Sequence, residues 1–317
     1  MSETGTASLH GFLATQGEEA WDRALTGLLA GIHAVDRNAT RIWFGFWPAK
    51  LTRELRESDD PLQTARELLL YGEYELQKSL DQSVAFLFGS RFWPEVRAGL
   101  ARYATQPDPS LCDIDGHVRK VTEELGSTTG ASPDLLLGIT AVGMRALAQM
   151  GLEAFDQPAA TRSTAGITAE KVYQERRRES RKGLFGFLRT VDQRHRVRWD
   201  ESDSSRTFEA VHGQDLTMAG AAAGDYSELD PRRIEGPVPI QCRNGACGFC
   251  WVGVLEGTDN LSEVTPFERR RMETFGYVDE ESPAESHPPI RLGCQARVQG
   301  DVTLVIPPWN GFLNGRR

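Results

Sequence analysis

Residues 242–250 read Cys-Arg-Asn-Gly-Ala-Cys-Gly-Phe-Cys, and a further thiol follows at Cys294. Four of the five cysteines therefore lie in the C-terminal part of the chain, three of them in one short segment. Thiolates bind iron and zinc, whereas disulfide scaffolds are typical of small secreted domains rather than of a chain of 317 residues. This stretch predicts a thiolate metal site in the C-terminal region.

The spacing of the four cysteines indicates the type of site. C-x4-C-x2-C with a distant fourth cysteine is the plant-type [2Fe–2S] ligand pattern, in which two irons bridged by two sulfides need four thiolates, two for each iron. Glycines let the loop turn tightly, so that backbone N–H groups approach the sulfurs and raise the reduction potential. The residues expected to bind the cluster are the ligands Cys242, Cys247, Cys250 and Cys294, together with Arg243, Gly245 and Gly248.

Zinc is the alternative occupant of these thiolates. Closed zinc sites usually take their ligands as two close pairs, whereas here one loop offers three cysteines and the fourth follows after 43 residues. The spacing therefore favours the iron–sulfur cluster. Cys112, the fifth cysteine, is expected to have no role, the alternative being a redox-sensing thiol.

Together with residues 291–295, Arg-Leu-Gly-Cys-Gln, this loop closely resembles the [2Fe–2S] ferredoxin family. The resemblance covers about residues 190–310 and implies a β-grasp fold, one-electron transfer and the four cysteine ligands. Three features depart from the family. The stretches from Gly224 to Cys242 and from Cys250 to Cys294 are longer than in plant-type ferredoxins. Residues 269–271 are arginines, where vertebrate-type ferredoxins dock through an acidic helix.

The C-terminal region has the pattern of a mixed α+β domain. Alternating residues at 196–199 and 207–211 predict a hairpin, and further strands are expected at 251–255 and 302–306. Asp215 can cap a short helix, and a capping box of Thr265 and Glu268 predicts another. This order predicts helices on one face of a mixed sheet.

The first 160 residues are expected to form an all-α domain of unknown function. Apolar residues recur at helical spacing from Gly17 to Ala34. Helix starts are predicted at Asp60-Pro61 and Ser132-Pro133, with the first helix running towards Leu80 and the second towards Phe155. Aromatic segments at 43–48 and 86–94 are expected to interrupt the helices and to pack in the core. The alternative for these segments is a ligand pocket or a docking surface.

Residues 161–189 are expected to connect the two domains. A linker at 161–166 precedes a basic helix capped by Thr168 and an apolar stretch at 183–188. A solvated connector is favoured, and docking of 171–188 on an acidic partner or a membrane surface is the alternative. The expected domains are thus 1–160, 161–189 and 190–317.

Composition limits the possible functions. A hydrophobic fraction of 39% argues against disorder, and a net charge of -9 argues against nucleic-acid binding. The chain has no apolar run near 18 residues and no export signal at its start, which predicts a cytoplasmic protein. Nicotinamide, flavin and P-loop fingerprints are also missing, so that an external reductase and an external acceptor are expected as partners.

These observations favour a one-electron carrier, rather than an enzyme, whose helical domain serves partner docking. The alternative is a redox sensor in which the state of the cluster controls the helical domain. An enzyme with its active site in the helical domain ranks third, because the scattered histidines and carboxylates form no catalytic constellation.

Overall fold

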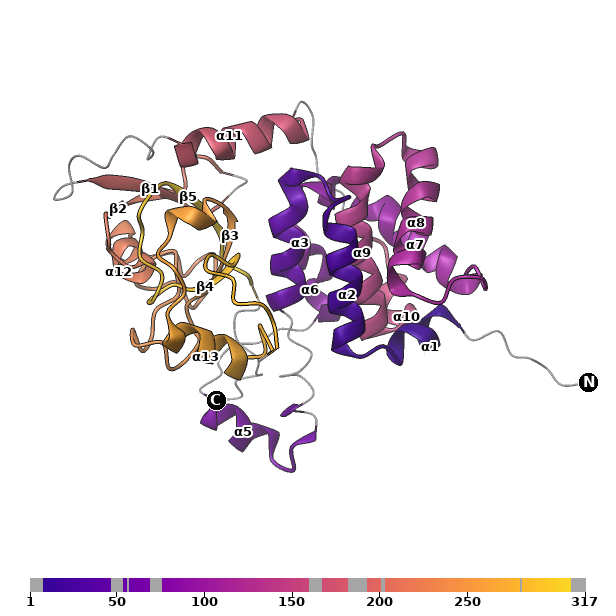
Figure 1. The fold of residues 1–317 in the computed structure, drawn as a ribbon, viewed down its shortest axis with the longest axis horizontal. Helices are drawn as coiled ribbons and strands as arrows, with labels where there is room; N and C mark the ends of the chain where they lie inside the picture. Colours follow the sequence, from indigo (N-terminus) through magenta and orange to yellow (C-terminus); the bar gives the residue numbers. More distant parts are fainter. Residues whose placement is uncertain are drawn as a thin grey trace, which may run out of the picture. The chain divides into compact units, whose positions relative to one another are not determined.

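The structure of the protein, a computed structural model, describes residues 8–46, 54, 55, 57–68, 76–159, 167–181, 193–200, 203–279 and 281–308. The chain divides into two compact units, Met1–Arg41 with Glu75–Ile167 and Ile42–Tyr74 with Thr168–Arg317. Figure 1 shows the helices of the N-terminal region in indigo and magenta, and the sheet labelled β1 to β5. The expected helical N-terminal region and C-terminal mixed sheet are both present.

Helix α9 (Pro133–Met150) forms the centre of the helical unit. Every residue from Leu136 to Leu147 is buried, and full burial of a Leu or Ile side chain contributes about 1.5–3 kcal/mol. The helix begins where the sequence predicts, but it ends at Met150. Gly151, with a φ of 79°, then separates α9 from the short helix α10. The elements packed against α9 are α1 (Leu9–Ala14), α2 (Glu18–Leu29), α6 (Leu76–Ser83), the 3-10 helix η1 (Phe88–Phe92), α7 (Trp93–Thr105), α8 (Ile114–Thr129) and α10 (Leu152–Phe155).

The two aromatic segments differ in structure. Trp43 and Phe46 lie in helix α3 (Ala34–Phe46), so the first segment continues a helix and the predicted interruption was wrong. Residues 47 and 48 fall outside the described residues. The second segment passes through η1 into α7, which has Pro94 in its first turn, so this segment does interrupt the helices as predicted. Trp43 and Trp93 are fully buried, which supports the packing role.

The helix predicted to begin at Asp60 starts as expected. The Asp60 carboxylate accepts a hydrogen bond from the Gln63 N–H at 2.9 Å, and Pro61 occupies the first turn of α5 (Pro61–Glu67). The side chain of Gln63 donates to Glu67 rather than reaching back to the cap. The helix was predicted to continue towards Leu80, but residues 69–75 lie outside the described residues.

The second unit contains one five-stranded sheet. Its order is β2-β1-β5-β3-β4, with β1 and β5 parallel and the other neighbours antiparallel. The predicted hairpin is confirmed by the pairing of Val197 with Phe208. Strand β4, only three residues long, was not predicted. The strands are β1 (Arg194–Arg198), β2 (Thr207–Val211), β3 (Trp251–Glu256), β4 (Ile290–Leu292) and β5 (Val302–Val305).

Three helices accompany the sheet, α11 (Ala169–Arg181), α12 (Leu216–Gly220) and α13 (Pro266–Thr274). Side chains cap each of them as predicted, because Thr168, Asp215 and Thr265 accept backbone N–H groups at 3.3, 3.0 and 3.1 Å. Helix α11 packs against β3 and β5. The predicted linker at 161–166 and the apolar stretch at 183–188 lie outside the described residues. Across the described part of the chain, no helix is long and apolar enough to cross a bilayer.

Candidate metal centre

The pairing of β3 with β4 explains how a distant cysteine reaches the loop. Trp251 pairs with Leu292, so Cys250 lies just before one strand and Cys294 just after the other. The Gly293 N–H donates to the Cys250 carbonyl at 2.8 Å, which continues the pairing beyond the strands. The fourth thiol is therefore brought to the loop by a sheet contact that spans the intervening residues.

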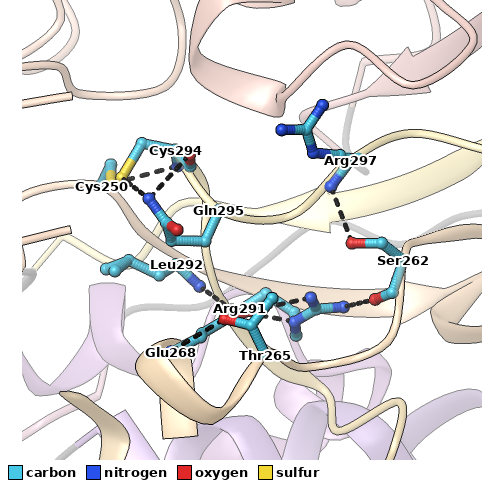
Figure 2. Close-up of polar contacts among 9 residues, drawn as sticks. All are labelled: Cys250, Ser262, Thr265, Glu268, Arg291, Leu292, Cys294, Gln295 and Arg297. Atoms are coloured by element: carbon cyan, nitrogen blue, oxygen red, sulfur yellow. Dashed lines mark hydrogen bonds and ion pairs between the residues drawn. The ribbon is translucent and has the colours of Figure 1, made fainter. Parts of the chain in front are cut away.

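The four thiols converge as two pairs. The Cys247 N–H donates to Cys242 Sγ at 3.3 Å, and the Cys294 N–H donates to Cys250 Sγ at 3.4 Å. The Phe249 N–H also donates to Cys247 Sγ, at 3.4 Å. Figure 2 shows Cys250 beside Cys294, with the side-chain amide of Gln295 directed at the Cys294 sulfur at 3.5 Å.

This paired arrangement fits a cofactor with two metal ions. A closed zinc site needs four ligands around one ion, whereas a two-iron cluster takes two thiolates for each iron. The donor set and its division into pairs thus favour the cluster over zinc.

In each pair the pKa of one thiol is lowered and the pKa of the other is raised. Hydrogen bonding from the Cys250 thiol lowers the pKa of Cys294 to about 7, and the same contact together with burial raises the pKa of Cys250 well above 9. Burial raises the pKa of Cys247 to about 11. For Cys242 burial also acts to raise the pKa, but N–H groups donated to the sulfur outweigh it and the pKa is lowered. The thiolate is the form that binds metal.

The loop adopts left-handed backbone at the two predicted glycines. Gly245 has a φ of 78° and Gly248 a φ of 66°. A Cβ on Gly248 would lie 2.4 Å from the buried ring of Phe275. Arg243 also has a positive φ, 59°, and is the one non-glycine residue of the described chain that does. Its half-exposed guanidinium forms an ion pair with Glu235, outside the thiol pairs.

A buried ion pair, which the sequence analysis missed, connects α13 to β4. Both Glu268 and Arg291 have side chains that are 0% exposed, and the guanidinium binds the carboxylate through two contacts of 3.0 and 2.9 Å (Figure 2). Glu268 also accepts the Leu292 N–H at 2.9 Å, two residues before Cys294. The predicted capping box forms only through Thr265, because Arg291 takes the Glu268 side chain.

A second residue missed as a site residue is Arg271 on α13, which the sequence marked only as part of a basic helix. Its Nε donates to the Gly245 carbonyl at 3.0 Å, and a terminal nitrogen donates to the Ala246 carbonyl. Burial lowers its pKa, and the thiols of Cys242 and Cys247 act in the opposite direction. The spacing of the cysteines could not predict this contact, because Arg271 meets the loop only in the folded chain.

We predict that Gly248→Ala destabilises the protein more than Gly213→Ala. Both glycines have a positive φ, which costs a residue with a Cβ about 1–2 kcal/mol, but nothing lies within 4 Å of a Cβ at Gly213. At Gly248 the added methyl also collides with Phe275. Chemical denaturation of both variants measures the difference, and equal losses in the free energy of unfolding would contradict it.

Breaking the buried ion pair should be costly. Arg291→Met leaves the Glu268 carboxylate buried without its partner, which costs about 3–5 kcal/mol of unfolding free energy. Arg297→Met makes the same substitution at an exposed position, serves as the matched control and should change stability by about 0.5 kcal/mol or less. If denaturant titrations gave the two variants the same free energy of unfolding, the ion pair would contribute nothing to stability.

Comparison with known proteins agrees with this geometry. Residues 201–299 match the 2Fe-2S iron-sulfur cluster binding domain. A plant-type ferredoxin of Pseudomonas putida is 30% identical over 101 residues, which cover 32% of this chain and 70% of that protein. No solved structure matches the chain significantly. The thiol pairs and the shared sequence lead to one conclusion: through its C-terminal region, the chain belongs to the family of plant-type ferredoxins that bind a [2Fe–2S] cluster.

Proposed function

We propose that this protein is a one-electron carrier whose cluster is held by Cys242 and Cys247 on one iron and by Cys250 and Cys294 on the other. The single observation that carries this assignment is the convergence of the four thiols as two hydrogen-bonded pairs. When bound, a [2Fe–2S] cluster supplies one-electron redox chemistry.

The surrounding residues hold the cluster and limit its contact with water. The N–H groups of Cys247, Phe249 and Cys294 are directed at sulfur and stabilise negative charge there. Cys247 and Cys250 are each 4% exposed, whereas Cys242 and Cys294 are partly exposed. A redox partner would therefore come nearest to the cluster at the partly exposed Cys242 and Cys294.

The fold assigned to the second unit is a β-grasp. The order β2-β1-β5-β3-β4, with its parallel β1–β5 pair inside an otherwise antiparallel sheet, supports this assignment. The two glycines and Arg243 are assigned the role of shaping the loop, which their positive φ values support.

The helical domain is assigned to partner docking, with an external reductase and an external acceptor as the partners. Its support is that residues 1–200 lie outside the domain match and that α9 gives the helical unit a core of its own. We propose that the chain divides into domains at 1–160, 161–189 and 190–317. The compact units differ from it, since Ile42–Tyr74 and α11 group with the sheet.

Redox sensing is the second candidate function. The observation that favours it is the packing of α11 against β3, because β3 begins at Trp251, directly after the proposed ligand Cys250. A structural change in the cysteine loop would then be transmitted through β3 to α11, which lies in the connecting segment 161–189.

Replacing any proposed ligand with serine should abolish cluster binding. Cys242→Ser, Cys247→Ser, Cys250→Ser and Cys294→Ser are expected to lose iron and acid-labile sulfide, because each iron would lack one of its thiolates. Cys112→Ser is the control and should retain both elements, since Cys112 lies in the other unit. Chemical analysis of iron and sulfide checks this, and a ligand variant with undiminished content contradicts the assignment.

Hydrogen exchange of the oxidised and the reduced protein separates the two candidate functions. For a carrier, exchange should differ only around residues 242–250 and near Cys294. For a sensor, the difference should extend into α11 and the helical unit. Changes confined to the cysteine loop would exclude the sensor, and protection changes in α8 or α9 would exclude the simple carrier.

A further inference from the structure

Helix α13 places one guanidinium directly against the cysteine loop. Arg271 donates to the carbonyls of Gly245 and Ala246, and its guanidinium lies over the ring of Phe275, 4.9 Å from the centroid. The Phe275 ring is itself buried and packs against Trp251. Two hydrogen bonds and one stacking contact thus fix the orientation of this side chain.

The charge of Arg271 has no carboxylate partner among the described residues. Its neighbour Arg269 pairs with Glu273 at 3.2 Å, and Arg243 pairs with Glu235. A partly buried cation without a counter-charge is costly. Arg271 instead contacts the segment between the proposed ligands Cys242 and Cys247, through the carbonyls of Gly245 and Ala246. The thiolates that this pair would supply to a cluster are therefore the negative charges proposed to offset it.

The peptide between Ala246 and Cys247 connects Arg271 to a sulfur. In a trans peptide the C=O and N–H groups point in opposite directions. Arg271 holds the Ala246 carbonyl on one side of this peptide, and on the other side the Cys247 N–H donates to Cys242 Sγ at 3.3 Å. Hydrogen bonding at the carbonyl also polarises the peptide and strengthens the bond that its N–H donates.

We propose that Arg271 is a positioning residue for the cluster. It aims the Cys247 N–H at the Cys242 sulfur and places a positive charge beside the Cys242–Cys247 pair. Both effects favour the more negative, reduced cluster, so Arg271 raises the reduction potential and slows loss of the cluster. This inference rests on the proposed cysteine ligands.

Three variants of the full-length, cluster-loaded protein test the proposal. Arg271→Gln removes the charge and weakens both hydrogen bonds. Arg271→Lys keeps the charge but loses the planar fork that serves two carbonyls. Arg270→Gln makes the same change of charge at the exposed neighbouring position and is the matched control. Redox titration gives the potential, and the rate of bleaching in the presence of a chelator gives the rate of cluster loss.

The expected results separate charge from orientation. In Arg271→Gln the ratio of reduced to oxidised cluster at a fixed applied potential should fall tenfold. For a one-electron couple this corresponds to a reduction potential lower by about 59 mV. Arg270→Gln should have the same reduction potential as the parent protein. Arg271→Lys should keep most of the potential but lose its cluster several-fold faster than the parent.

Equal potentials for Arg271→Gln and Arg270→Gln would overturn the proposal. If Arg271→Gln does not retain a cluster, Arg271→Lys decides: faster cluster loss supports the proposal, and loss at the parent rate overturns it. Failure of the proposed function is distinguishable, because the parent protein itself would then contain no redox-active iron and sulfide.

Discussion

The ion pair between Glu268 and Arg291 joins the two elements on which the metal centre depends. Arg291 lies in β4, three residues before Cys294, and Glu268 lies in α13, three residues before Arg271. Because Glu268 also binds the Leu292 N–H, the same carboxylate fixes the chain on its way to the fourth thiol. Two fully buried charges with matched hydrogen bonds permit few alternative arrangements, since leaving either one unpaired is costly.

The two elements joined by this ion pair, β4 and α13, each contact one of the two thiol pairs. Strand β4 pairs with β3 and brings Cys294 to Cys250, which forms one thiol pair. Helix α13 brings Arg271 to the loop carbonyls beside the other pair, Cys242 and Cys247. The stretch between Cys250 and Cys294 contains the helix that supports the loop.

The local features of this fold could be predicted from sequence, and the long-range ones could not. Asp60, Asp215 and Thr265 were identified as caps because capping depends on residues within one helical turn. Strand β4 escaped prediction because its three residues carry an arginine, whose burial depends on a glutamate 23 positions earlier in the sequence.

The same distinction applies to the site. Cysteine spacing was sufficient to predict the type of cluster, because ligand number and order are local properties of the loop. Arg271 and the Glu268–Arg291 pair were missed as site residues, since their roles arise from side chains that meet only in the folded chain. Gly151, which ends α9, shows the same limit within the helical unit, where apolar periodicity alone predicts one longer helix.

Four thiolates, arranged as two pairs, are proposed to hold a two-iron cluster in this protein. The most direct measurement is an electron paramagnetic resonance spectrum of the purified protein after reduction with dithionite. A rhombic spin-one-half signal, together with equal amounts of iron and sulfide, is the predicted result. A redox-silent metal, or a protein that yields no signal on reduction, would contradict the account.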